Sequence, residues 1–338
     1  MKKYGAQASI EDLQKVKDSL RKLLTLNGKC LYRPVRQAVM NDDVNLMEII
    51  LNTSYDFNDR REGCTPLEWA CQSGRTEIVQ LLINSSKDSG IDLNAKDNDG
   101  RTALHLPCFA VLSDDSIAKR TEIVQLLIKS SKDFGIDLNA RDVTGCTAFL
   151  IACRCGNTEI VQSFVTSSKE FNIDLNTRDD KGCTAFHRAC CGGRKAAETV
   201  QFFITSSKNF NIDLNTRDDK GWTALHWACK FAQTELVELL VKNLKECGLD
   251  INAQDNQGKA PLDLAKEQIH QPYFHPGKKE HLEKIIKILE VEYSKTRNPR
   301  RPLRRLLLAR PAGGWLALLA TTPGAHPPPT HLEYNHQN

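Results

Sequence analysis

Hydrophobic and polar residues follow one pattern that occurs five times along the chain. Each copy opens with a polar turn, Asp-x-x-Gly-x-Thr, and a short apolar segment of the type Ala-Leu-His-x-Ala-Cys. A second segment, Thr-Glu-Ile-Val-Gln-Leu-Leu-Ile, has apolar residues at helical spacing and leads into a connection, Ile-Asp-Leu-Asn. The copies are Cys64–Asn94, Arg101–Asn139, Cys146–Asn176, Cys183–Asn215 and Trp222–Asn252. The pattern predicts two helices per copy, and the repetition predicts a solenoid with one continuous core.

The threonine before each first helix gives the repeat length. An interval of 37 residues separates Thr65 from Thr102 and Thr147 from Thr184, whereas 45 residues separate Thr102 from Thr147. The extra residues fall between the two predicted helices, at Leu112–Arg120 and Gly193–Ala196. A loop between packed helices lengthens at modest entropic cost, so we expect the stacking to survive both insertions.

The turn and first-helix motif resembles that of the ankyrin repeat family across residues 60–265. Asp97–His105 and Asp218–His226 resemble the turn and first helix of that family, and Thr76–Ile83 and Thr121–Ile128 resemble its second helix. The resemblance implies an all-α repeat solenoid of stacked helix-turn-helix ankyrin repeats joined by short β-hairpin-like loops. Independently of the family, threonine suits a helix N-cap. We expect the ring nitrogens of His105, His187 and His226 to bond neighbouring loop backbone.

The repeats are about four residues longer than the commonest ankyrin period of about 33. The surplus follows the second helix and amounts to about one helical turn. We therefore expect a second helix that is one turn longer, with Phe134, Phe171 and Phe210 folding back to close its end.

Three regions are expected. Residues 1–33 form an N-terminal capping helix, and residues 34–296 form the repeat domain, about seven repeats with the first (34–59) and last degenerate. In the last repeat the second helix is expected at His281–Leu289. Residues 297–338 hold seven of the 13 prolines, six Arg and one Glu. We expect this tail to be disordered, with a short peptide ligand or surface-attachment motif as the alternative.

The chain has a formal net charge of +4, and the tail alone contributes +5, so residues 1–296 carry −1. A nearly neutral repeat domain argues against a general nucleic-acid binder, which needs a basic face. Leu303–Leu319 is too short and too interrupted to span a membrane. We expect an intracellular protein, cytoplasmic or nuclear, because no N-terminal signal peptide indicates an oxidising compartment. We also expect a monomer.

Twelve cysteines and nine histidines raise the question of metal binding, and the repeat register answers it. Cys71, Cys108, Cys153, Cys190 and Cys229 share one first-helix position, and Cys64, Cys146 and Cys183 share another. Free cysteine serves well as a small buried hydrophobic residue. The densest group, Cys183, His187, Cys190 and Cys191, contains three such repeat positions, so we favour packing over zinc. His270, His275 and His281 match no metal signature. No cofactor is expected.

No catalytic motif rises above the repeat pattern: a phosphate-binding Gly-rich loop, a Gly-x-Ser-x-Gly elbow and a His-Glu-x-x-His helix are all absent from the sequence. Acidic residues recur in every Ile-Asp-Leu-Asn connection, which indicates loop hydrogen bonding and not a unique acid–base pair. We therefore expect that this protein is not an enzyme.

Binding is the remaining class of function. The resemblance implies a concave face, built from turn tips and first-helix ends, that holds a protein or peptide. Residues that differ between repeats at those positions are the candidates, because the needs of the scaffold do not explain them. The candidates are Arg101, Phe109, Arg154, Lys181, Lys220, Trp222, Lys230 and Phe231, with Glu62 and Gln72 at equivalent positions. Trp222 is either an exposed hot spot or a residue that packs on the next tip; both interpretations stay open. Trp69 and Trp227 are expected in the core.

The main hypothesis is a non-catalytic protein-interaction scaffold. One alternative is a substrate-recruiting adaptor of a ubiquitin ligase, because Pro302-Leu303 and Leu332–Tyr334 faintly resemble a suppressor-of-cytokine-signalling box. That box expects a Cys where Leu307 stands. Another alternative is a fragment of a larger ankyrin-containing channel or signalling protein.

Overall fold

The computed structural model describes residues 31–60, 63–109, 114–192, 195–269 and 276–296. The chain divides into two compact parts, residues 1–296 and 297–338, and all described residues belong to the first part. The predictions for the N-terminal helix up to residue 30, for Glu62, for His270 and His275, and for the tail lie outside the described residues.

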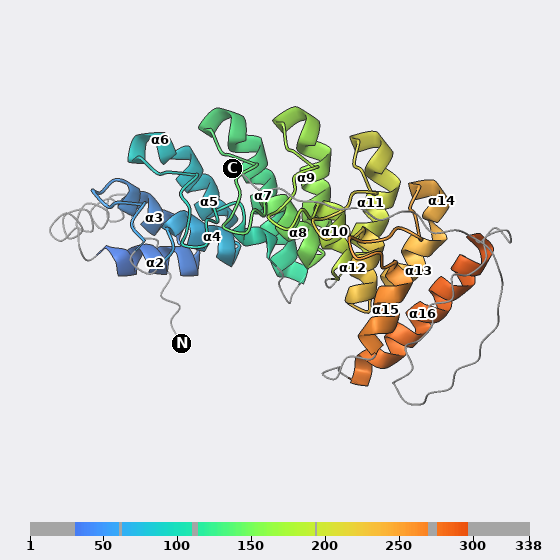
Figure 1. The fold of residues 1–338 in the computed structure, drawn as a ribbon. Helices are drawn as coiled ribbons and strands as arrows, with labels where there is room; N and C mark the ends of the chain where they lie inside the picture. The colour runs from blue at the N-terminus through green and yellow to red at the C-terminus, as the bar shows by residue number, and fades with distance from the viewer. Residues whose placement is uncertain (1–30, 61–62, 110–113, 193–194, 270–275, 297–338) are drawn as a thin grey trace, which may run out of the picture. The chain divides into compact units, whose positions relative to one another are not determined.

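Helices are arranged in two rows (Figure 1). The first-helix row is α2 (Tyr32–Asn41), α4 (Pro66–Ser73), η2 (Leu106–Cys108), α8 (Ala148–Cys155), α10 (Ala185–Cys190), α12 (Ala224–Lys230) and α15 (Pro261–Ile269). The second-helix row is α3 (Val44–Leu51), α5 (Thr76–Asn84), α7 (Asp114–Phe134), α9 (Thr158–Phe171), α11 (Ala196–Phe210), α13 (Thr234–Lys242) and α16 (Pro276–Thr296). Each helix contacts the next helix in its row and its partner in the other row. We call each such pair a unit and number the units 1 to 7 along the chain.

This arrangement confirms the predicted all-α repeat solenoid. Apolar side chains from both rows form one buried cluster that runs from Leu31 to Leu289. The loops contribute a single isolated antiparallel bridge, Arg141 to Thr147, among the described residues. The first unit, α2 and α3, covers the segment predicted as a degenerate repeat, and α16 is longer than the predicted His281–Leu289 at both ends.

The start of a first helix is held by the same contacts in units 3, 5 and 6. In unit 6 the Thr223 backbone N–H donates to His226 Nδ1 over 3.1 Å, and His226 Nε2 lies 3.2 Å from the Lys259 carbonyl oxygen in the next unit. His105 and His187 repeat the two contacts toward Cys146 and Trp222. A nitrogen that accepts from a backbone N–H carries no proton, so Nε2 carries it and donates to the carbonyl. The predicted role of these histidines is confirmed.

The turn before each first helix, which we call the tip loop, is closed by an aspartate in units 3 to 7. In unit 6, Asp218 Oδ1 accepts the backbone N–H groups of Lys220 and Trp222 at 2.9 and 2.8 Å. The tip loops are also linked to one another: the Asp219 N–H donates to the Lys181 carbonyl over 3.1 Å, and the Asn256 N–H donates to the Lys220 carbonyl over 3.0 Å. A side chain at Gly182, whose φ is +71°, would clash with Asp219. Consecutive tips therefore form one fixed edge.

A second edge is formed by the Ile-Asp-Leu-Asn connections. Each aspartate accepts the backbone N–H of the asparagine two residues later, as Asp137 does from Asn139 at 2.9 Å. In units 2 to 5 the asparagine side chain then donates to a carbonyl of the next unit, as Asn94 does to Gly135 over 2.8 Å. The same aspartate contact recurs at Asp92, Asp174, Asp213 and Asp250. The predicted loop hydrogen bonding of these aspartates is confirmed.

Unit 3 departs from the predicted first helix. Pro107 stands where the other full units have alanine, and only the short 3₁₀ helix η2 forms there. Proline has no N–H to donate within a helix. Side chains of other elements donate to carbonyl oxygens that lack an intrahelical partner. The Asn157 amide donates to the Cys108 carbonyl over 2.8 Å, and the Arg120 guanidinium donates to the Phe109 carbonyl over 3.3 Å. The same guanidinium reaches Gln72 of unit 2 over 2.7 Å.

The insertion in unit 3 is helical and not a loop along most of its length. Residues 114–120 form the first turns of α7, which is 21 residues long. The prediction that both insertions only lengthen inter-helix loops is therefore wrong for this segment. The added turns bury Ile117, which is 7% exposed, and burial of this apolar side chain favours a helix over an open loop.

The predicted extra turn of the second helix is confirmed in units 3, 4 and 5, where α7, α9 and α11 end at Phe134, Phe171 and Phe210. In units 2 and 6 the extension is a separate piece, α6 (Ser86–Ser89) or α14 (Leu244–Cys247). The three phenylalanines are half-buried against the core. A lysine ammonium of the preceding unit lies over each ring, 5.1, 4.7 and 5.7 Å from the centroid for Lys87, Lys132 and Lys169. These contacts join neighbouring extensions.

The three buried histidines make stability depend on pH. Burial lowers the pKa of His105, His187 and His226 below the usual value near 6.5. The unfolded chain then takes up protons first, so stability is complete above about pH 6.5 and falls as the pH decreases, by at most about 1.4 kcal/mol per pH unit for each histidine. Urea unfolding at about pH 7.5 and about pH 5.5 measures this loss.

The control for this prediction is a variant with leucine at the three histidine positions, because unit 4 has Leu150 there. The variant is expected to lose less stability between the two pH values than the natural chain. An unchanged pH dependence would show that other groups cause it.

Candidate functional site

Two of the eight predicted binding residues, Arg101 and Phe109, are engaged within the array. The Arg101 guanidinium pairs with Asp97 and Asp99, each at 2.7 Å. It also lies over the Phe109 ring, 5.6 Å from the centroid. These contacts bridge the tip loop of unit 3 to the end of η2, so both side chains have a structural role.

Four of the other candidates, Lys220, Trp222, Lys230 and Phe231, come together in unit 6. Trp222 meets Trp227 edge-on, with ring centroids 5.3 Å apart, and Trp227 stacks on Phe231 at 5.8 Å. Trp227 is 9% exposed, which confirms its predicted core position, whereas Phe231 is 38% exposed. The Lys220 ammonium lies 5.0 Å from the centre of the Trp222 ring. An aromatic strip therefore runs from the tip of unit 6 to the end of α12.

Trp222 contacts the next tip loop and also exposes part of its ring to solvent. Its indole N–H donates to Asp255 Oδ2 of the next tip over 3.0 Å. Cys146 and Cys183 hold the same repeat position, and their thiols lie 3.9 Å from Asp179 and Asp218. The contact with the next tip is thus a shared scaffold feature, as one of the two interpretations expected. The indole nevertheless stays half-buried, so part of its ring faces solvent.

A surface hollow of about 390 Å³ lies beside the strip, between units 6 and 7. We call it the Trp222 hollow. It is lined by Asp219, Lys220, Trp222, Lys230, Asp255, Asn256, Gln257, Lys259, Leu264, Glu267 and Gln268. Three of its residues were predicted candidates, and the strip supplies its aromatic wall.

The carboxylates around the Trp222 hollow are already occupied or turned away. Asp255 is 8% exposed. Burial alone would raise the pKa of Asp255. Its carboxylate accepts hydrogen bonds from the backbone of Lys259 and Gln257 and from the Trp222 indole, and these bonds lower the pKa below its usual value. Glu267 accepts the Lys259 ammonium at 2.6 Å. Asp219 lies over Gly182 of the preceding tip.

The sequence analysis missed the residues that unit 7 contributes to the hollow. Gln268 is 8% exposed, and its Oε1 accepts the Lys230 ammonium at 3.3 Å. Lys259 occupies the repeat position of Trp222. The register could have identified Lys259, but Gln268 lies beyond the part of the first helix that the repeat pattern covers.

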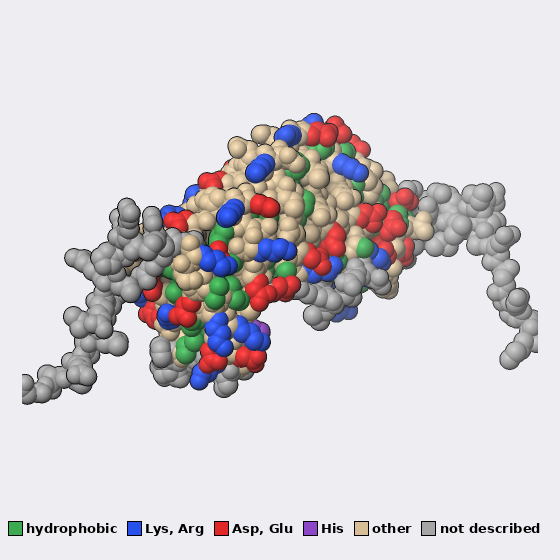
Figure 2. All heavy atoms as spheres, turned by 90° about the vertical axis from the view of Figure 1, so that its right-hand side faces the viewer, with side chains coloured by type: hydrophobic (Ala, Val, Ile, Leu, Met, Phe, Trp, Pro, Cys, Tyr) green, Lys and Arg blue, Asp and Glu red, His purple; other side chains and the backbone are tan. Residues whose placement is uncertain are grey.

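The two remaining candidates lie on the same row in earlier units. Lys181 is exposed at the tip of unit 5, and Arg154 is half-buried in the last turn of α8. Neither forms an ion pair with a described residue. Figure 2 shows that basic and acidic side chains are interspersed on the face toward the last units.

The cysteines at repeat positions have the structural role that the register predicted. Cys71, Cys108, Cys153, Cys190 and Cys229 are fully buried in the core. Burial raises the pKa of Cys183 to about 12 and that of Cys191 to about 11, which keeps both thiols protonated at neutral pH. The exposed His281 meets Thr234 Oγ1 at 3.1 Å. Among the described residues no three His, Cys, Asp or Glu side chains are grouped to hold a metal ion.

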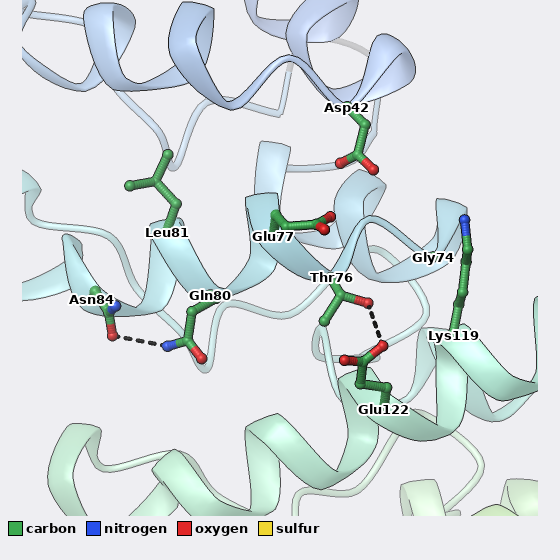
Figure 3. Close-up of a pocket in the computed structure, with 9 residues that line it drawn as sticks. All are labelled: Asp42, Gly74, Thr76, Glu77, Gln80, Leu81, Asn84, Lys119 and Glu122. Atoms are coloured by element: carbon green, nitrogen blue, oxygen red, sulfur yellow. Dashed lines mark hydrogen bonds between the residues drawn. The ribbon is translucent and has the colours of Figure 1, made fainter.

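A second hollow, of about 520 Å³, lies between α5 and α7, beside Asp42 at the end of α2 (Figure 3). Asp42, Glu77 and Glu122 line it, together with Lys119. Burial, with the nearby Glu77 carboxylate, raises the pKa of Asp42 above its usual value. Glu122 accepts the Thr76 hydroxyl at 3.2 Å. This second hollow contains none of the predicted binding residues, and no aromatic side chain lines it.

No helix in the described part of the chain is long and apolar enough to cross a membrane. Leu303–Leu319, which the sequence analysis expected not to span a membrane, lies outside the described residues.

Comparisons with known proteins agree with the fold. A family model described as ankyrin repeats (3 copies) matches residues 35–142, 116–218 and 195–273. The ankyrin repeat domain of Bcl-3, a member of the IkappaB protein family, is 24% identical with a TM-score of 0.51, and the match covers 69% of this chain and 87% of that domain. An ankyrin repeat domain from Acinetobacter baumannii AYE is 23% identical, with a TM-score of 0.48 over 68% of this chain and 97% of that one.

Among curated proteins, Alpha-latroinsectotoxin-Lt1a of Latrodectus tredecimguttatus is 32% identical over 87 residues. That segment is 25% of this chain and spans only 6% of the toxin's length. The family match covers well over half of this chain, from the first described unit to the last. The chain belongs to the ankyrin repeat family.

Proposed function

We propose that this protein is a non-catalytic, intracellular interaction scaffold that binds a protein partner along its first-helix row and tip loops. Ankyrin repeats are a general protein-interaction domain, and that membership supports the class of function. The eleven described cysteines are unpaired, which fits a reducing compartment. We also propose the domain organisation expected from the sequence, with residues 34–296 as the binding domain.

The aromatic strip is the proposed centre of the binding site. Binding energy concentrates in a few residues, with Trp and Tyr enriched, at the centre of an interface. Within the strip, Trp222 is half-buried and Phe231 is 38% exposed, so both offer apolar surface on a rigid support. Trp227 holds that support because its indole N–H donates to Asp218 over 3.0 Å.

Affinity capture of partners tests the proposal. The Trp222→Ala/Phe231→Ala double variant is expected to lose its specific partners, since hot-spot truncation costs about 2 kcal/mol or more, roughly 30-fold in affinity. The matched control is Phe171→Ala/Phe210→Ala, which removes two half-buried rings from the ends of the second helices. If both double variants kept every partner of the natural chain, these aromatic residues would belong only to the scaffold and the proposed site would be wrong.

A further inference from the structure

The Trp222 hollow holds two ammonium groups that form no ion pair with a carboxylate in the described part of the chain. Among the described residues, the Lys220 ammonium lies over the face of the Trp222 ring, and the Lys230 ammonium donates to the neutral amide oxygen of Gln268. Neither lysine forms an ion pair with any residue that the structure describes. The nearby carboxylates do not reach them, because Asp255 is bonded to the tip of its own unit and to Trp222, and Glu267 is bonded to Lys259.

The hollow also presents a neutral donor. The oxygen of Gln268 is taken by Lys230, and the amide nitrogen of this 8% exposed side chain donates to no described residue. Two ammonium groups and an amide N–H at the edge of an aromatic wall form a donor set suited to a carboxylate.

The unpaired positive charges continue along the row. Lys181 in unit 5 and Arg154 in unit 4 lie at tip and first-helix positions, like Lys220 and Lys230 in unit 6. Neighbouring helices pack about 8–10 Å apart, and a chain in the extended polyproline II conformation rises about 3.1 Å per residue, with side chains three residues apart on the same side. A bound extended segment would therefore pass about one unit for every three residues.

We propose that the occupant of the Trp222 hollow is an acidic side chain from an extended internal segment of the partner protein, with further acidic side chains about every third residue toward unit 4. This inference rests on the proposed function and specifies the chemistry of the partner. A row of charges spread over three units favours an internal segment over a single C-terminal carboxylate. The half-buried Trp222 ring then contacts the aliphatic part of the bound segment.

The test uses the full chain and a fluorescein-labelled peptide of four Glu-Ser-Gly triplets with an amidated C-terminus. Fluorescence anisotropy is expected to show binding at low ionic strength that weakens as salt is added. The Lys220→Gln/Lys230→Gln variant should bind about 5-fold or more weakly, since two exposed charge pairs are lost. A Lys208→Gln/Lys245→Gln variant removes the same charge from exposed positions on the second-helix row, and its affinity should be unchanged.

Three outcomes would overturn the inference. The first is an equal effect of both lysine pairs, which would indicate nonspecific attraction. The second is equal binding of a Gln-Ser-Gly peptide with a free C-terminus, which would identify a terminal carboxylate as the ligand. The third is tighter binding of a uridine-rich single-stranded RNA with the same dependence on Lys220 and Lys230.

A charge reversal keeps the test independent of small effects on folding. The Lys220→Glu/Lys230→Glu variant is expected to reject the Glu peptide and bind the corresponding Lys-Ser-Gly peptide, and failure of this exchange would contradict the inference. Capture experiments separate the two proposals: if the Glu peptide does not bind but partners are lost from Trp222→Ala/Phe231→Ala, the scaffold function stands and the acidic ligand is wrong.

Discussion

Replacing Phe203 with alanine is expected to lower the free energy of unfolding by about 3–5 kcal/mol. Phe203 on α11 is completely buried, and its ring centroid lies 6.3 Å from Phe149 of unit 4 and 5.9 Å from Phe186 of its own unit. The ring therefore links two units. In a repeat protein each unit contacts only its neighbours, so a cavity at this point weakens the coupling between the two halves of the array.

Phe202→Ala is the matched control, because Phe202 is the adjacent residue on α11 and only half-buried. Its loss of stability should be clearly smaller. Urea denaturation monitored by circular dichroism gives both values, and Phe203→Ala is also expected to broaden the transition or split it in two. Equal losses in the two variants would contradict the assigned role of Phe203.

The second large effect is expected at the buried ion pair between Asp179 and Arg188. The Asp179 side chain is fully buried and the Arg188 side chain 11% exposed. Asp179 Oδ2 accepts from both Nε and Nη2 of the arginine, while Oδ1 accepts the N–H groups of Lys181 and Cys183. Asp179→Asn leaves the arginine charge buried without its partner, which costs about 3–5 kcal/mol.

Asp142→Asn provides the comparison for this variant. Asp142 has the same place in the tip loop of unit 4, where its Oδ1 accepts from Thr144 and Cys146, but it has no buried arginine partner. An asparagine oxygen still accepts these bonds, so a loss below about 1 kcal/mol is expected. Similar losses at Asp142 and Asp179, measured by urea denaturation, would show that turn closure and not the ion pair determines the cost.

The repeat register allowed most of the scaffold to be predicted. Residues that recur at one position have the same contacts in several units, as the His105, His187 and His226 contacts show. Where one residue of a contacting pair is replaced in a repeat, its partner is replaced as well. In unit 2 Glu68 stands at the histidine position and accepts the Thr65 N–H, and Arg60, which replaces the turn aspartate, pairs with Glu68 at 2.6 Å.

The unpredicted features depend on contacts between residues far apart in sequence. Pro107 could be seen in the sequence, but its consequence depends on Arg120 and Asn157, which bond the carbonyls left by the missing helix. The candidate site shows the same limit. Variation between repeats selected Lys220, Trp222 and Lys230, whereas the hollow also needs Gln268 from the next unit. Register identifies residues that differ and not the neighbours that they face.

The central claim is that partners bind along the first-helix row, around the aromatic strip of unit 6. Site-specific photo-crosslinking in cells tests it most directly. A photoreactive amino acid at Lys230, on the first-helix row, is compared with the same amino acid at Lys208, on the second-helix row. We expect a discrete crosslinked protein from position 230 and none from position 208. The same crosslinked protein from position 208 alone, or from both positions equally, would contradict the assignment of the binding face.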